Sequence, residues 1–184
     1  MPILGAMSHH VVLLRGINVG GRHSLAMAEV REALGGAGFT DVATYIQSGN
    51  IVLGSRLEAS RVADRVQGVL EELAGFPVPT VVLGAPEFRE VLAGCPFRPA
   101  EPKLAHVVVL PRDLDDERRE RLLALAAADD SSSELAVGSR VVYLSHPDGL
   151  SRSVLATRAM ALLKDATARN LATMAALEAM VARV

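Results

Sequence analysis

Apolar side chains in the N-terminal half of the chain recur with two spacings, one typical of strands and one of helices. Short apolar runs predict buried strands, and a stripe of valines and leucines at intervals of three and four predicts an amphipathic helix. Two of the strands flank a Ser-Gly-Asn turn and therefore form a hairpin. The predicted elements are a strand over residues 11–15, a helix over 25–37, strands over 42–47 and 51–53, a helix over 57–73 and a strand over 78–83. The order β-α-β-β-α-β is that of a ferredoxin-like unit.

The C-terminal half shows the same kinds of hydrophobic pattern, and they predict one strand fewer. The predicted elements are a helix over residues 86–93, a strand over 106–110, a helix over 114–127, strands over 135–137 and 140–144, and closing helices over 151–163 and 169–184. The order β-α-β-β-α is an incomplete echo of the first half, without a convincing repeat of residues. The predicted fold class is therefore α/β (α+β), with two ferredoxin-like halves, the second incomplete, and C-terminal helices. The predicted halves span residues 9–84 and 85–184, and residues 1–8 form an N-terminal extension.

A glycine-rich loop follows the first predicted strand, in residues 15–21. Glycines before a helix allow a backbone to approach an anion, but this spacing is neither the dinucleotide-binding nor the P-loop pattern. The glycines are therefore interpreted mainly as requirements of a tight connection. Arg15 is different, because an arginine at the end of a buried strand must be paired or must point into a cleft. Asn18 is the other polar candidate in this loop.

The hairpin carries a second group of polar residues. Strand alternation predicts that Tyr45 and Gln47 share one face. A turn that needs left-handed backbone explains Gly49 and Asn50. The shared polar face is not explained by the turn, and it predicts a polar surface or groove.

A third segment precedes the last predicted helix. Thr167 is a plausible N-cap of that helix, and Arg169 then lies near its N-terminus, where a cation is disfavoured unless an anion is close. Asn170 belongs to the same segment. By contrast, the histidines and Cys95 lack the spacing of metal ligands, and no nucleophile motif is present, so no metal is expected.

Residues 13–21 and 44–50 together resemble the signature of a bacterial family, domain of unknown function 1697. Residues 166–173 resemble the C-terminal motif of the same family, so the resemblance extends from about His9 to the last helix. It implies an α/β fold with ferredoxin-like halves, in agreement with the predicted elements. It implies no activity.

Several positions depart from the family pattern. Leu171 and Ala172 stand where the C-terminal motif usually has Trp and Asn. Gly84 stands where an arginine is common, and Cys95 replaces an asparagine before Pro-Phe. Met7 lies where the family usually begins, which fits the interpretation of the preceding residues as an extension.

Composition narrows the classes of function further. The chain has 184 residues, a net charge of −2, 22% charged and 3% aromatic residues, which argues against nucleic acid or an anionic membrane as a partner. No apolar run approaches the roughly 18 residues of a membrane span. The single cysteine, Cys95, cannot form an internal disulfide, and the N-terminus lacks a basic signal-peptide region. We expect a soluble cytoplasmic protein that needs no cofactor.

The leading hypothesis is a site for a small, anionic ligand at the junction of the two halves. The residues expected to line it are Arg15, Asn18, Tyr45, Gln47, Asn50, Arg169 and Asn170. Arg15 and Arg169 would clamp the anion, while Gln47 and Asn50 would orient it. If catalysis occurs, Tyr45 is the only acid or base that the sequence offers, and a phenol is a poor default. The sequence does not decide whether the protein is an enzyme.

Two other hypotheses belong to different classes of protein. One is single-stranded nucleic-acid binding through the open face of a sheet, which needs aromatic residues on central strands. The other is a non-catalytic interaction module, in which the apolar face of the last helix forms an oligomer contact. The residues of that face are Met174, Leu177, Met180 and Val181. The oligomeric state itself is left open.

Overall fold

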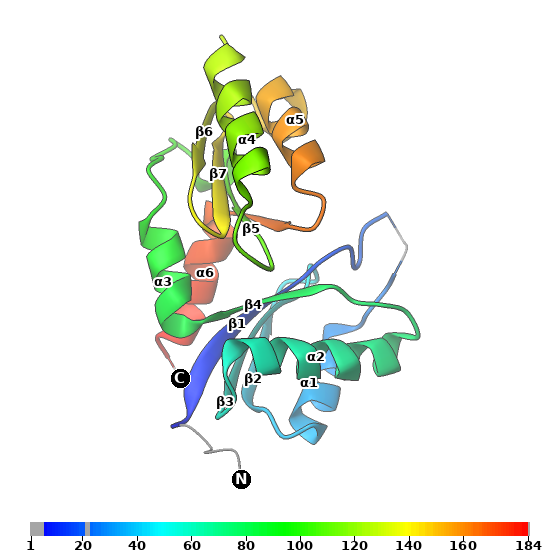
Figure 1. Ribbon diagram of the computed structural model, residues 1–184. Coiled ribbons are helices and arrows are strands. Elements are labelled where there is room, and N and C mark those ends of the chain that lie inside the picture. The colour runs from blue at the N-terminus through cyan, green and yellow to red at the C-terminus, as the bar shows by residue number, and fades with distance from the viewer. Residues whose placement is uncertain (1–5, 21–22, 184) are drawn as a thin grey trace. The chain divides into compact units, whose positions relative to one another are not determined.

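The computed structural model describes residues 6–20 and 23–183. The chain divides into two compact units, which are considered separately below (Figure 1). Unit 1 comprises Met1–Glu90 together with Ala176–Val184, and unit 2 comprises Val91–Ala175. This division differs from the predicted boundary after residue 84, because most of one connecting helix and the end of the last helix group with unit 1. Gly21 of the glycine-rich loop, residues 1–5 of the predicted extension and Val184 lie outside the described residues.

Unit 1 contains the six predicted elements in the expected order. They are β1 (Ser8–Leu14), α1 (Met27–Gly36), β2 (Thr40–Tyr45), β3 (Asn50–Ser55), α2 (Ala59–Ala74) and β4 (Thr80–Gly84). The strands form an antiparallel sheet in the order β2-β3-β1-β4. The ferredoxin-like order predicted from hydrophobic spacing is therefore confirmed, with shifts of one to three residues at the ends of the elements. Since β1 begins at Ser8, the predicted extension overlaps the first strand by one residue.

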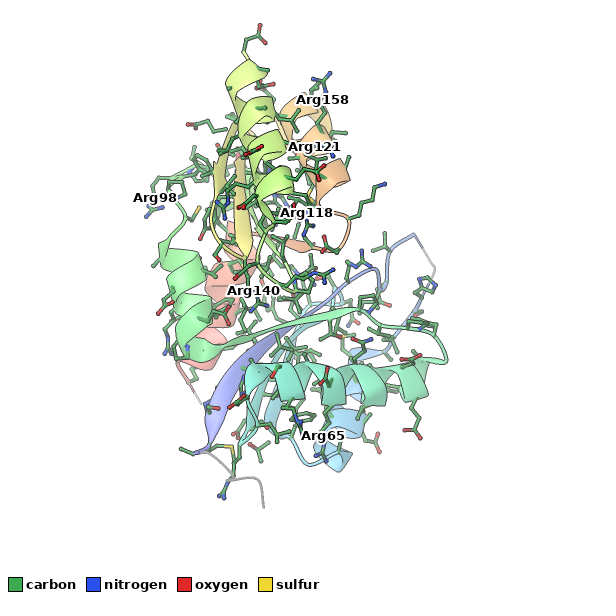
Figure 2. The ribbon with its side chains drawn as sticks, viewed as in Figure 1. Arg65, Arg98, Arg118, Arg121, Arg140 and Arg158 are labelled. Carbon is green, nitrogen blue, oxygen red and sulfur yellow. The ribbon has the colours of Figure 1, made fainter. Side chains whose placement is uncertain are left out.

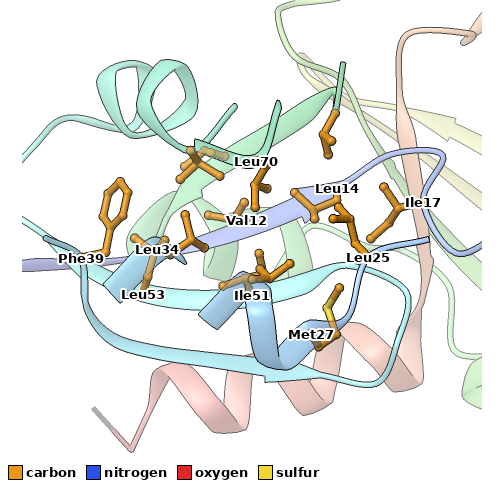
Figure 3. Close-up of a cluster of buried hydrophobic side chains, with 14 of the residues drawn as sticks. Val12, Leu14, Ile17, Leu25, Met27, Leu34, Phe39, Ile51, Leu53 and Leu70 are labelled. Atoms are coloured by element: carbon orange, nitrogen blue, oxygen red, sulfur yellow. The ribbon is translucent and has the colours of Figure 1, made fainter. Parts of the chain in front are cut away.

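The core of unit 1 lies between one face of this sheet and helices α1 and α2 (Figure 3). Strand alternation turns Val12 and Leu14 toward the helices, where they meet residues such as Leu34 and Leu70. Two residues of the loop after β1, Ile17 and Leu25, belong to the same buried cluster. The glycine-rich loop is therefore anchored in the core rather than lying free on the surface.

Unit 2 repeats the full order of elements, not the incomplete one predicted. It contains β5 (Ala105–Val109), α4 (Asp116–Ala128), β6 (Glu134–Val137), β7 (Val141–Ser145), α5 (Val154–Leu162) and β8 (Thr167–Asn170). The sheet order is β6-β7-β5-β8. The prediction that the second half lacks a strand is wrong, because residues 167–170 pair with β5 from Val109↔Thr167 to His106↔Asn170. This short polar strand is defined by its pairing with a distant strand, which local sequence does not reveal.

Helices α3 (Ala85–Ala93) and α6 (Leu171–Val181) are divided between the units. Within unit 1, an ion pair joins them, with 3.0 Å between Arg89 Nε and Glu178 Oε1. Helix α6 is apolar on nearly all sides, and a helix of that kind is normally buried. Met174, Leu177 and Val181 are accordingly buried within the chain. Two short 3-10 helices, Pro102–Leu104 and Leu150–Arg152, complete the assignment for the described residues.

We predict that Gly49→Ala destabilises unit 1 far more than Gly20→Ala does. Both glycines have positive φ, +74° and +59°, but a Cβ at Gly49 would lie 2.6 Å from Leu14 Cβ, whereas one at Gly20 meets nothing within 4 Å. The left-handed backbone alone costs an alanine about 1–2 kcal/mol, and overpacking adds about 1–3 kcal/mol at Gly49. Urea unfolding of both variants measures the difference. Equal losses in the two variants would contradict the proposed close approach.

Candidate functional site

The glycine-rich loop and the β2–β3 turn are interlocked in unit 1. The amide N–H of Leu14 donates to the carbonyl of Gly49 at 2.8 Å. The side-chain amide nitrogen of Asn18 donates to the carbonyls of Gln47, at 2.6 Å, and Leu25, at 3.0 Å. Its oxygen accepts the N–H of Leu25 at 2.8 Å. The two segments that the sequence singled out are therefore neighbours in space, and Asn18 is one of the links between them.

Asn50 has a similar structural role inside the hairpin. Its side chain is fully buried, and its amide nitrogen donates to the carbonyl of Tyr45 at 3.1 Å and to Ser48 Oγ at 2.9 Å. These bonds close the turn between β2 and β3. Together with the bonds of Asn18, they show that two of the expected ligand contacts stabilise the local fold.

The prediction that Tyr45 and Gln47 share a strand face is wrong. Strand β2 ends at Tyr45, and Ile46 has a positive φ of 50°, so the alternation stops before Gln47. Gln47 lies in the turn with an exposed side chain, while Tyr45 is half-buried. The turn requires left-handed backbone at two positions, Ile46 and Gly49, and this extra curvature was not visible in the alternation of residues.

Arg15 follows β1 at the start of the loop and is half-buried. Its main-chain N–H donates to the carbonyl of Pro79 at 2.9 Å, which fixes the point where its side chain leaves the backbone. Arg15, Asn18, Tyr45, Gln47 and Asn50 thus come from one connected part of unit 1.

The third segment has a different structure from the one predicted. Thr167 does not cap the last helix, because it begins β8. The cap is Asn170, whose side-chain oxygen accepts the N–H of Thr173 at 2.9 Å, in the first turn of α6. Residues 167–170 stay extended up to the start of α6 because they pair with β5, so the helix cannot begin at Thr167.

Arg169 lies on β8 opposite Val107. Its Nη1 donates to Thr167 Oγ1 and to the carbonyl of Ala168, both at 2.8 Å. Burial lowers the pKa of Arg169 to about 10. The surroundings of this guanidinium therefore disfavour its charge relative to water. Arg169 and Asn170 belong to unit 2, and the expectation that they join the unit 1 residues in one site stays a prediction.

A histidine pair in unit 2 was not predicted from the sequence. His106 Nδ1 and His146 Nε2 lie 2.7 Å apart and share a hydrogen bond, although the residues are 40 positions apart. His146 is 1% exposed. Burial lowers the pKa of His106 to about 4, with a smaller contribution from His146, and burial also lowers the pKa of His146. The pairing of β5 with β7, in which His106 is opposite Leu144, brings the two rings together.

A weak signal in the sequence could have pointed to this pair. Residues 10–14 read His-Val-Val-Leu-Leu and residues 106–110 read His-Val-Val-Val-Leu. His10 and His106 lie on β1 and β5, which occupy the same central position in the two sheets, so His10 is the counterpart of His106. His10 is also buried, and burial lowers its pKa.

No metal centre accompanies these histidines. Within residues 6–20 and 23–183, no group of three or more His, Cys, Asp or Glu side chains could hold a metal ion. Cys95, in unit 2, is a buried free thiol. Among the described helices, none is long and apolar enough to span a membrane.

Two ferredoxin-like units linked by α3 and α6 define the class of this α/β protein. The chain belongs to the family described as protein of unknown function (DUF1697), whose model matches residues 7–143. This confirms the resemblance seen in residues 13–21 and 44–50, whereas residues 166–173 lie beyond the matched range. The family carries no established activity in that description.

A solved structure shows the same fold. The conserved bacterial protein SP0830 from Streptococcus pneumoniae matches with a TM-score of 0.71 and 21% identity, over 96% of this chain and 99% of that chain. At this identity the likeness establishes the fold alone. A search of curated proteins found no match to this chain.

We predict that the stability of the protein falls as the pH drops from about 6.5 toward 4, partly through His106. An unfolded histidine titrates near pH 6.5, whereas burial lowers the pKa of His106 to about 4 in the fold. In this window the unfolded chain binds a proton that the folded chain does not, so acid favours unfolding. His106→Gln, which keeps a hydrogen-bonding side chain, should reduce this acid-dependent loss in thermal melts recorded between pH 4 and 7.

The matched control is His23→Gln, because the side chain of His23 is exposed. This variant should keep the acid-dependent loss of the parent protein. An unchanged slope in His106→Gln would show that the buried pair does not control the response.

Proposed function

We propose that the protein binds a small anionic ligand through Arg15 and Arg169. The observation that carries this proposal is the interlocking of the loop after β1 with the β2–β3 turn, through Asn18 and Gln47, which gathers Arg15 and the polar residues of the turn in one part of unit 1. A charge-assisted hydrogen bond from a guanidinium to an anion is stronger than a neutral one. Arginine also suits carboxylate and phosphate groups because its planar guanidinium can donate two parallel hydrogen bonds.

The interlocked segments of unit 1 supply the rest of the proposed contacts. The amides of Asn18 and Asn50 are bonded to main-chain oxygens, so they are assigned to positioning. Tyr45 and Gln47 are the side chains proposed to orient the ligand, because Tyr45 ends β2 at the start of the turn and Gln47 lies in the turn. Asn170 positions Arg169 by ending β8 and capping α6.

In each unit, central-strand residues on the sheet face opposite the helices are also buried, which weighs against binding of nucleic acid through that face. In unit 1, Val11, Leu13 and Val52 alternate with the helix-facing residues and are 0% exposed. Val107 and Val109 are equally buried in unit 2. RNA-recognition domains need an exposed face with aromatic side chains for base stacking. The alternative of an oligomer contact through α6 is weakened similarly, since Met174 and Leu177 are buried within the chain.

The proposal is limited to binding. A cytoplasmic location and the absence of a cofactor remain part of the same proposal. It assigns no reaction to Tyr45 or to the histidine pair.

We predict that thermal-shift screening will find a phosphate- or carboxylate-bearing compound that raises the melting temperature. The probes are inorganic phosphate, pyrophosphate, citrate and nucleoside monophosphates, with the matching nucleosides as uncharged controls. Arg15→Gln and Arg169→Gln should each weaken binding of the best probe at least tenfold, as measured by calorimetry. A charge-assisted hydrogen bond contributes about 1.5–3 kcal/mol, and 1.4 kcal/mol corresponds to about tenfold. Arg61→Gln, which alters an exposed arginine on α2, serves as the matched control.

Two outcomes would contradict the proposal. One is that no anion in the panel stabilises the protein. The other is that both arginine variants, shown to be folded by circular dichroism, bind the best probe as tightly as the parent.

A further inference from the structure

A groove of about 450 Å³ runs between α4 and α5 in unit 2. Small-molecule sites in proteins have volumes of roughly 300–1,000 Å³ and mainly apolar linings with a few charged groups. The residues that line this groove are Arg121, Ala124 and Leu125 from α4, and Arg158, Ala161 and Leu162 from α5. None of these described residues is acidic.

The two walls of the groove carry the same short pattern. Residues 121–125 and 158–162 both read Arg-x-x-Ala-Leu, and the same three positions of each face the groove. Residues at intervals of three and four lie on one face of a helix, so each helix presents an arginine, an alanine and a leucine in one stripe. The groove is therefore built from two copies of one arrangement.

The helices run in opposite directions, which relates the two copies by an approximate two-fold axis. Strands β5 and β7 are antiparallel, and each is followed by one of the helices. At one end, Arg118 near the start of α4 bonds Asp165 after the end of α5, with 2.8 Å between Nη1 and Oδ1. At the other end, Ser153 before α5 donates to Ser133, which follows α4, at 2.8 Å. Arg121 and Arg158 consequently lie toward opposite ends of the groove (Figure 2).

Alanine side chains explain why the groove exists. Ala124 and Ala161 extend only a methyl group from each helix and are both exposed. Longer side chains at these positions would fill the space between helices whose axes are typically about 8–10 Å apart. Ala124 and Ala161 form the apolar floor of the groove, which therefore lies between the charged side chains of Arg121 and Arg158.

A nearby carboxylate competes only weakly for one of these cations. Glu117 Oε1 lies 3.8 Å from Arg121 Nη1, in a pair whose side chains are 83% and 60% exposed. Exposed ion pairs one helical turn apart contribute about 0.3–0.5 kcal/mol. Such a pair gives way readily to a ligand that also buries apolar surface.

We propose that this groove binds an amphiphilic carboxylate, whose acyl chain packs against Ala124 and Ala161 and whose carboxylate pairs with an arginine. The charge of the arginines selects the head group, and the apolar floor selects the chain. The site uses none of the residues assigned to the anionic ligand above, and it stands independently of that proposal.

The approximate two-fold symmetry gives this site a distinctive property. A ligand with a single carboxylate can bind in either of two directions, with its head group at Arg121 or at Arg158. Removing one arginine eliminates one direction only, which reduces affinity by about twofold for two equal binding modes. Removing both arginines eliminates the charge contribution altogether.

The test is a calorimetric titration with decanoate at a concentration below micelle formation, using the full chain. Arg121→Gln and Arg158→Gln should each weaken binding by about twofold, and the double variant by at least tenfold. Extending the chain from octanoate to decanoate should strengthen binding by about two- to fourfold per methylene, because each fully buried methylene corresponds to about fourfold. Ala161→Leu should abolish binding by filling the floor.

Two controls separate this site from other effects. Decanol, which has the chain without the charge, should bind at least tenfold more weakly than decanoate. Arg61→Gln, which alters an exposed arginine on α2 outside both proposed sites, should leave decanoate binding unchanged. The inference is overturned if decanoate does not bind at millimolar concentration, if decanol binds equally well, or if the double variant retains the affinity of the parent.

Discussion

The side-chain amide of Asn18 is the interaction on which the distinctive part of unit 1 depends. It joins the loop after β1 to the carbonyl of Gln47 in the β2–β3 turn, and it closes the loop on itself through Leu25. Asn18 itself adopts a positive φ of 53°, a conformation that asparagine tolerates better than most residues. Ile17 and Leu25, 3% and 4% exposed, hold the same loop in the core. These contacts hold the residues that follow β1, including the point where Arg15 leaves the strand, and the residues that precede α1.

Hydrophobic spacing predicted those elements whose stability comes from a regular apolar face. The stripe of Val62, Val66 and Leu70 correctly placed α2, and the apolar run around Val12 placed β1. Strand β8 was missed because its residues are polar and its evidence lies in the pairing with β5, more than 50 positions earlier in the chain. Such pairing is a property of the folded sheet, which a window of neighbouring residues does not contain.

The sequence singled out two segments that are neighbours in unit 1, but it did not give the contacts of their individual side chains. Asn18 and Asn50 donate to the main-chain carbonyls of Gln47 and Tyr45, and these bonds hold the turn in place. The His106–His146 contact could not be read from spacing, because the register of β5 against β7 creates it. Only the structure therefore separates the polar residues of a motif that bond the main chain from those whose side chains can contact a ligand.

The two units share an order of elements but differ in how their cores are filled. The buried cluster of unit 1 consists of large side chains and includes Met27 at the start of α1, brought in by the long loop. The cluster of unit 2 includes Ala156, Ala159 and Ala166, and only a short connection separates β5 from α4. The groove of unit 2 is lined by two further alanines, Ala124 and Ala161. A common fold thus places an anchored polar loop in one unit and an open groove in the other, which is why binding must be argued from the residues of each unit rather than from the fold.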